Sequence, residues 1–276
     1  MLNIRSIKNR ANDVLLPYRT QFIRVLVIVM VLQAIPSLIS GDNVIVSLLS
    51  MILSLLFLPV SHGVVVSSLK MVRNNGMSVN DDDGLVGFKR FKELFPTYII
   101  VYFFTFLLVF GICLILGVIL TMLIGQTVST TYMVPVGNTD LSYLVNAILS
   151  SPSHVILILI MFLLVLVVTF VVDAVLMPAP YLLEQYHLTG MNAVKTSVKM
   201  MKSHIFDYLK LYLSFLGWMF LAALIEAFVS QLISVTLVVT VIVGLFKIFT
   251  YLPLYYLSEA VLFEEIAFYH FHEAGD

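Results

Sequence analysis

Charged residues are scarce in this chain. Asp, Glu, Lys and Arg make up 11% of the 276 residues, whereas they make up about 25% of a usual soluble domain. Apolar residues make up 61%, which is more than a water-soluble fold of this size can cover with polar surface. The net charge of −1 gives no support for binding to nucleic acid. The composition therefore predicts an integral membrane protein.

Cysteine and catalytic motifs are also missing or nearly so. Cys113 is the single cysteine, so an intramolecular disulfide and a cysteine metal site are both excluded. The chain has no Walker A motif, no G-x-G-x-x-G, no H-E-x-x-H and no G-x-S-x-G. ATP hydrolysis, dinucleotide redox chemistry, zinc proteolysis and the usual serine hydrolysis therefore have no support. We expect a protein that is not an enzyme, with no catalytic residues and no cofactor.

Long apolar stretches are what the chain has instead. A helix needs about 20 mostly apolar residues to cross the hydrocarbon core of a bilayer. The segment from Leu211 to Leu257 is too long for one span, and we divide it near Ser230 to Ser234. The other spans are Phe22 to Ile39, Val44 to Leu69, Tyr98 to Ile124 and His154 to about Leu183. The expected fold class is all-α, with six transmembrane helices.

The basic residues lie on one side of this arrangement. Five of the 15 precede or begin the first span, five lie between spans two and three, and four lie between spans four and five. None lies in the opposite loops. Because loops rich in Lys and Arg stay cytoplasmic, both termini are expected in the cytoplasm. In the opposite loop between spans three and four, Leu141, Leu144, Val145 and Ile148 share one face of a predicted short surface helix.

An internal repeat organises the chain. Three times, a basic amphipathic segment leads into a helical hairpin. These segments are Arg5 to Arg19, Gly87 to Phe95 and Asn192 to Ile205. The returning helices carry Pro59, Pro178 and Pro253, and a proline kinks a helix because it removes one backbone donor. We expect a single polytopic membrane domain over residues 1–276, with repeat-like units 1–79, 80–190 and 191–276.

Ionisable side chains within spans are candidate functional residues, since a bilayer makes them costly. Asp173 and Lys247 lie five and six residues before a kink proline, so we predict an intramembrane ion pair that either lines a cavity or fixes helix packing. Glu226 lies in span five or at the outer interface. Glu184 and Glu259 each follow a kink proline by six residues. This shared spacing predicts one structural role for both, in capping or in pairing with lysines of the basic segments at the cytoplasmic surface.

Other polar clusters give weaker signals. His270 and His272 lack a third ligand at a suitable spacing, and no metal site is predicted. Asp81, Asp82 and Asp83 lack the spacing of an EF-hand. We expect these three residues to form a solvated turn and the start of a helix.

A Ser-Phe-x-Gly-Trp segment begins span five, and a Pro-x-Tyr followed by Phe-Tyr lies near the C-terminus. An amphipathic stretch with Ser197, Met200 and Met201 precedes them. The motif residues are Leu213, Ser214, Phe215, Leu216, Gly217 and Trp218, then Pro253, Tyr255, Phe268 and Tyr269. In these motifs, and over His62 to Phe91, the chain resembles a bacterial membrane protein family called domain of unknown function 975. The resemblance implies a bacterial plasma membrane protein and implies no activity.

Two functions are compatible with these features. The first is a non-enzymatic protein that binds or passes a membrane-soluble amphiphile, a lipid or a peptide, between kinked hairpins. Its basic segments suit an anionic inner leaflet. The second is a structural or accessory subunit of another membrane complex, with a role in envelope stress or antimicrobial tolerance. The expected partners are membrane lipids and, in the second case, another membrane protein, but no nucleic acid.

Overall fold

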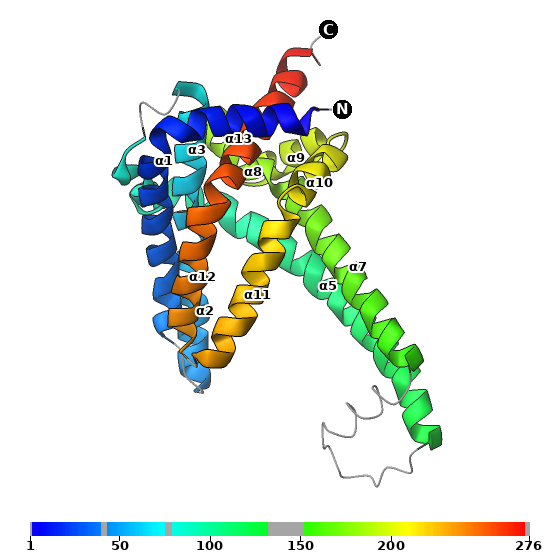
Figure 1. The fold of residues 1–276 in the computed structure, drawn as a ribbon. Helices are drawn as coiled ribbons and strands as arrows, with labels where there is room; N and C mark the ends of the chain where they lie inside the picture. Colours follow the sequence, from blue (N-terminus) through cyan, green and yellow to red (C-terminus); the bar gives the residue numbers. More distant parts are fainter. Residues whose placement is uncertain (1, 40–42, 75–78, 132–151, 234, 274–276) are drawn as a thin grey trace. The chain divides into compact units, whose positions relative to one another are not determined.

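The computed structural model describes residues 2–39, 43–74, 79–131, 152–233 and 235–273. These residues form helices joined by short turns, and none of them forms a strand (Figure 1). The elements in chain order are α1 (Ile4–Ala34), η1 (Ile35–Leu38), α2 (Val44–Leu56), η2 (Leu58–Ser61), α3 (His62–Asn74), η3 (Asp81–Leu85), α4 (Val86–Lys89), α5 (Phe91–Thr131), α7 (Pro152–Leu176), α8 (Pro178–Tyr186), α9 (Gly190–Met201), α10 (Ile205–Leu213), α11 (Leu216–Leu232), α12 (Thr236–Thr250), α13 (Leu252–Phe268) and η4 (Tyr269–Glu273).

Several helices are suited to span a membrane. Four are long and apolar enough to do so by length and composition, covering Ile4–Leu38, Val44–Asn74, Phe91–Ile119 and Pro152–Tyr186. Two bent pairs raise the number to six if each pair is one span. Helices α10 and α11 meet at 55°, and α12 and the segment from Leu252 onward meet at 60°. The all-helical, membrane-type character predicted from composition is thus present in the fold.

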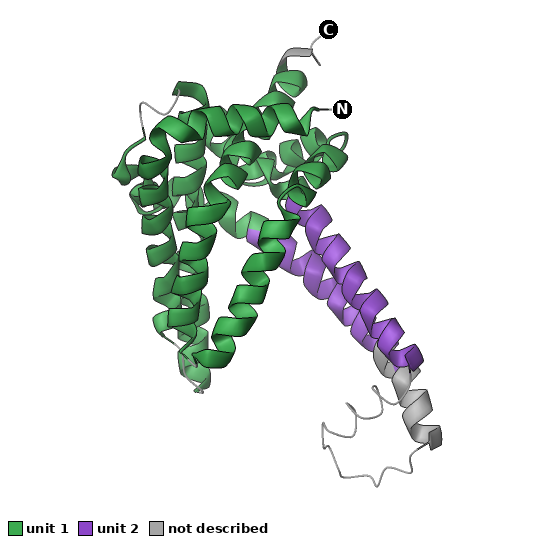
Figure 2. Ribbon diagram, viewed as in Figure 1, with its two compact units in different colours: residues 1–101, 174–276 green, residues 102–173 purple. Residues whose placement is uncertain are grey.

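The chain divides into two compact units, which Figure 2 colours separately. Unit 1 comprises residues 1–101 and 174–276, and unit 2 comprises residues 102–173. In unit 1, helices α1, α3 and α13 pack against one another. Their fully buried side chains include Ile7, Phe22, Met71 and Phe263. The repeat-like units 1–79, 80–190 and 191–276 do not coincide with these boundaries and stay a prediction.

Helix α1 joins the first basic segment and the first span into one element. Asn3 caps it, because its side-chain oxygen accepts hydrogen bonds from the backbone N–H groups of Arg5 and Ser6 at 3.1 and 3.3 Å. Figure 1 shows that the helix changes direction along its length. The proline inside it is Pro17, which removes one backbone donor and permits such a bend. The helix that carries the basic residues of this segment therefore continues without interruption into the apolar stretch.

Each of the three kink prolines lies in the first turn of a new helical segment. Pro59 lies in η2, Pro178 begins α8, and Pro253 lies in the first turn of α13. Proline suits this position because the first N–H groups of a helix have no intrahelical partner. At Pro59 and Pro178 the chain runs on within the candidate spans Val44–Asn74 and Pro152–Tyr186, whereas before Pro253 it bends by 60°.

The turns agree in part with the sequence analysis. Helix α11 ends at Leu232 and α12 begins at Thr236, close to the division expected at Ser230 to Ser234. The surface helix predicted around Leu141 to Ile148 lies outside the described residues.

The acidic run differs from the expectation at one residue. Asp81 and Asp82 are exposed, but Asp83 is only 4% exposed. Its carboxylate accepts a hydrogen bond from Lys70 Nζ at 2.6 Å and another from the backbone N–H of Asn80 at 3.0 Å. The prediction of a solvated turn is wrong for Asp83. Its carboxylate takes part in the N-terminal capping of η3 and forms an ion pair with Lys70 of α3.

The helices of unit 2 are the part of α5 from Tyr102 onward and most of α7. Over residues 102–119 of α5 and 155–172 of α7 the side chains are almost all apolar on every side, as expected for spans that face lipid. Their large exposed side chains include Phe103, Phe106, Leu107, Leu114, Ile115, Ile156, Leu159, Phe162 and Leu163.

Candidate functional site

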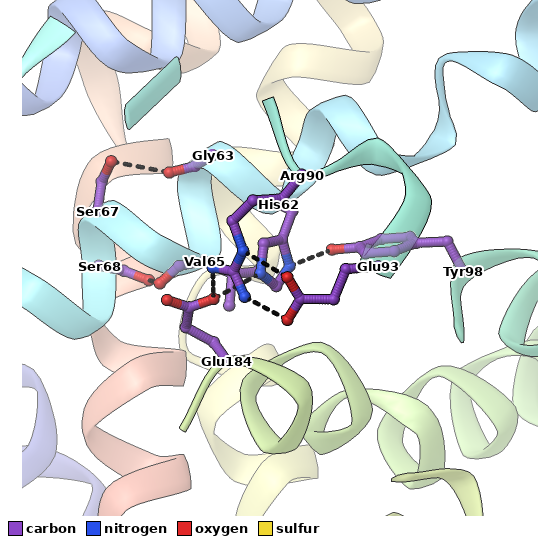
Figure 3. A network of polar contacts seen from close by, with 9 residues as sticks. All are labelled: His62, Gly63, Val65, Ser67, Ser68, Arg90, Glu93, Tyr98 and Glu184. Carbon is purple, nitrogen blue, oxygen red and sulfur yellow. Dashed lines mark hydrogen bonds and ion pairs between the residues drawn. The ribbon is translucent and has the colours of Figure 1, made fainter. Parts of the chain in front are cut away.

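A polar network joins three segments of unit 1 (Figure 3). His62 begins α3, Arg90 directly precedes α5, Glu93 and Tyr98 lie in α5, and Glu184 lies in α8. His62 is fully buried, and Glu184 and Arg90 are partly buried. The network therefore connects the second basic segment to two of the helices that follow kink prolines.

Glu184 is the centre of this network. Its Oε2 atom lies 3.0 Å from His62 Nε2 and accepts a hydrogen bond from Arg90 Nη1 at 2.6 Å. On the other side of the imidazole, His62 Nδ1 lies 3.0 Å from the hydroxyl of Tyr98. Removing the Glu184 carboxylate would leave the fully buried His62 with an unmet hydrogen bond.

Arg90 is held from two sides. Besides Glu184, it binds Glu93 through Nε at 2.9 Å and Nη2 at 2.7 Å, which is the bidentate geometry that suits a guanidinium and a carboxylate. The hydrogen bond with Glu93 raises the pKa of Arg90 above its already high value, so the guanidinium stays charged. Glu184 thus always faces a positive charge.

Sequence reasoning singled out Glu184 and missed most of its partners. It expected a lysine of a basic segment as the partner, whereas the partner is Arg90, an arginine of the second basic segment, Gly87 to Phe95. His62 was not singled out. The sequence does contain a signal for His62. The third residue after each kink proline is a ring-bearing polar residue, namely His62, Tyr181 and Tyr256.

Glu259 lies in a second polar cluster of unit 1, where it is 7% exposed. It accepts a hydrogen bond from the hydroxyl of Tyr208 at 3.0 Å, and this hydroxyl lies 3.1 Å from that of Tyr255. The ring of Tyr255 packs edge-on against Phe215 at 5.4 Å, and Lys8 Nζ lies 4.3 Å from the centre of the Phe215 ring. The phenylalanine of the Ser-Phe-x-Gly-Trp segment therefore links α1 to the tyrosines around Glu259.

Tyr208→Phe is expected to lower the free energy of unfolding by about 2 kcal/mol, because it removes a donor from a buried carboxylate. Thermal unfolding of the purified protein, followed by circular dichroism, measures the change. Tyr102→Phe serves as the control, since Tyr102 is 45% exposed and its change is expected within about 0.5 kcal/mol. Equal stability of the two variants would contradict the assigned hydrogen bond.

The intramembrane candidates are placed differently. Lys247 Nζ, near the end of α12, lies 3.9 Å from Glu226 Oε2 in α11. The side chains of Glu226 and Lys247 are 57% and 35% exposed. Asp173 is the last residue of unit 2. The ion pair between Asp173 and Lys247 stays a prediction, whereas Glu226, expected in the span or at the interface, lies near Lys247.

Two grooves lie beside Arg10 of α1, and we name them after the nearer chain terminus. The amino-terminal groove has a volume of about 510 Å³ and is lined by Asn3, Arg5, Ser6, Asn9, Arg10, Asp13, Val14 and Val72. The carboxy-terminal groove has a volume of about 380 Å³ and is lined by Arg10, Gln185, Tyr186, Glu264, Glu265, Phe268 and Tyr269.

Arg10 separates the two grooves. Its guanidinium donates a hydrogen bond to Glu264 at 3.1 Å, and Arg73 of α3 donates to the other oxygen of Glu264 at 3.0 Å. Two arginines thus share one carboxylate at the ends of α1, α3 and α13. Among the described residues, no three His, Cys, Asp or Glu side chains gather as metal ligands would.

Comparison with known proteins gives one match. No curated protein and no solved structure matches the chain. A family model described as Protein of unknown function (DUF975) matches residues 1–239. This range includes the Ser-Phe-x-Gly-Trp segment and ends before Pro253, and the assignment of both motifs to the family stays a prediction. Since the match covers most of the chain, this protein belongs to the DUF975 family.

Proposed function

We propose that this protein is a non-enzymatic multi-pass protein of a bacterial plasma membrane that binds or passes a membrane-soluble amphiphile. In this proposal six spans form three hairpins, both termini are cytoplasmic, and the amino-terminal groove holds the phosphate of the head group. The observation that carries the proposal is this groove, which places two arginines, one aspartate and three neutral hydrogen-bonding side chains at the start of α1, ahead of its apolar part.

The chemistry of the amino-terminal groove favours an anion. Arg5 and Arg10 supply guanidinium groups, and Asp13 is the acidic residue of the lining. Asn3, Ser6 and Asn9 add amide and hydroxyl groups. The N-terminus of α1 adds the positive end of a helix dipole. Guanidinium groups bind phosphate oxygens in charge-assisted hydrogen bonds, so a phosphate-bearing head group fits this lining.

The surroundings of the groove favour a membrane amphiphile over a free anion. Val14 and Val72 form an apolar part of the lining, and α1 continues into a stretch suited to span a bilayer. Basic residues next to spans gather at the level of the lipid head groups on the cytoplasmic side. The head group of a lipid bound there would thus contact charged side chains, and its acyl chains would contact the apolar part of α1.

An accessory role in another membrane complex remains the second candidate. The observation in its favour is α11, in which Ala222 is the buried residue. Large exposed side chains on this helix include Trp218, Phe220 and Phe228. A helix of a partner protein would bury these side chains as effectively as lipid does. A stoichiometric protein that co-purifies from native membranes, and is lost when Phe220 and Phe228 are changed to Ser, would favour this role.

Arg5→Gln tests the proposed head-group site. Each basic residue near an anionic membrane surface contributes about 1 kcal/mol, which corresponds to about fivefold in affinity. We therefore expect the variant to retain about fivefold less phosphatidylglycerol than the unchanged protein. Native mass spectrometry of the full chain in detergent, with phosphatidylglycerol and phosphatidylcholine of matched acyl chains, measures retention.

Lys199→Gln is the matched control. It removes the same charge from an exposed position on α9 outside both grooves. Its retention of phosphatidylglycerol is expected to stay near that of the unchanged protein. Equal losses in the two variants, or no preference for phosphatidylglycerol in the unchanged protein, would overturn the head-group site.

A further inference from the structure

The carboxy-terminal groove has the opposite charge balance from its neighbour. Its lining contains Glu264 and Glu265 against the single cation Arg10, whereas the amino-terminal groove sets two arginines against one aspartate. Tyr186, Phe268 and Tyr269 supply aromatic rings to the same lining. Carboxylates combined with aromatic faces attract organic cations. The two grooves therefore favour ligand groups of opposite sign on either side of Arg10.

Some hydrogen-bond acceptors of the residues that line this groove have no donor among the described residues. Glu264 already accepts hydrogen bonds from Arg10 and Arg73. Glu265 forms no hydrogen bond or ion pair within the part of the chain that the structure describes. The side-chain oxygen of Gln185 is buried and has no hydrogen-bond donor among the described residues. A buried acceptor without a donor is uncommon in folded proteins, and a rotation of the Gln185 side chain would turn this oxygen toward a donor bound in the groove.

We propose that the carboxy-terminal groove binds a primary ammonium group, and that the ligand is a phospholipid whose head group carries both a phosphate and a primary amine. This inference rests on the proposed function, because the phosphate would lie in the amino-terminal groove. Arg10 lines both grooves, so the grooves adjoin at this residue, and in this proposal one head group extends across it. The ammonium group would donate to Glu265 and, after a side-chain rotation, to Gln185.

A primary amine suits this lining better than a quaternary one. An ammonium group has three N–H donors, which match a carboxylate and an amide oxygen. A trimethylammonium group would still meet the aromatic rings, but it has no N–H donor for Glu265 or Gln185. The groove should therefore distinguish phosphatidylethanolamine from phosphatidylcholine, although both lipids carry the same phosphate.

Competition between these two lipids tests the inference. The full chain in detergent is mixed with phosphatidylethanolamine and phosphatidylcholine of matched acyl chains, and retention is measured by native mass spectrometry. We expect phosphatidylethanolamine to be favoured about tenfold, the effect of one hydrogen bond to a charged group. Glu265→Gln is expected to remove this preference and to leave phosphatidylglycerol retention unchanged. Gln185→Met is expected to reduce the preference by a smaller factor.

Controls separate the sources of the ligand and the two proposals. Asp82→Asn removes a carboxylate from an exposed ion pair with Lys89 and should keep the preference. Free phosphoethanolamine at millimolar concentration should not displace the lipid, and displacement would overturn the assignment to a lipid. If phosphatidylglycerol retention depends on Arg5 but phosphatidylethanolamine has no advantage, the ammonium site is wrong and the head-group site stands. If no lipid is preferred, both fail.

Discussion

Glu184→Ala is expected to lower the free energy of unfolding by about 3 kcal/mol, the low end of what loss of one partner costs a buried ion pair. The carboxylate is 22% exposed and contacts both Arg90 and the fully buried His62. Its removal leaves a guanidinium and an imidazole without their shared acceptor. For a chain of this size the loss corresponds to a fall of about 8 °C in the unfolding temperature, which circular dichroism in detergent measures.

Glu93→Ala is the matched control for this variant. Glu93 also binds Arg90, but its side chain is 42% exposed and does not contact His62. Exposed ion pairs contribute about 0.2–1 kcal/mol, so the unfolding temperature should fall by only about 2 °C. Equal falls in the two variants would show that burial at Glu184 does not decide the energetics of the network.

Gly87→Ala is expected to destabilise unit 1 by about 3 kcal/mol, the upper part of the usual range for overpacking. A Cβ atom at this position would collide with the carbonyl oxygen of Pro59 and lie 2.6 Å from the Cα atom of Val60. Both obstacles are backbone atoms, which cannot rotate aside as a side chain does. The clash would separate α4 from η2, next to Arg90 and the kink proline, and thermal unfolding measures it.

Gly111→Ala is the same substitution in an open position. No described atom outside the local helix lies within 4 Å of a Cβ built on Gly111, which is inside α5. Here alanine is expected to stabilise the helix by about 0.5–1 kcal/mol, because glycine loses more conformational freedom on folding. The two glycine variants should therefore shift the unfolding temperature in opposite directions. A fall in both would indicate that the contact of Gly87 is not the cause.

Local sequence determined the helices and their breaks. Apolar runs of sufficient length predict spans, since a chain in lipid must satisfy its backbone hydrogen bonds within a helix. The three prolines predicted interruptions near the ends of the returning helices, and new segments begin at Pro59, Pro178 and Pro253. These effects act over a few residues along the chain, so they are predictable from the sequence without knowledge of the tertiary contacts.

The tertiary structure decided which charges meet. Spacing pointed to Glu184 and to lysines of the basic segments as partners, but packing brings Arg90 and His62 to the same carboxylate oxygen. Likewise Lys247 lies beside Glu226, a neighbour that its spacing from Pro253 did not predict. Partner choice depends on how each helix is rotated and where the chain bends, and these are set by the combined packing of segments far apart in the sequence. The membrane character was therefore a property of composition, whereas the polar network and the two grooves at Arg10 are properties of the fold.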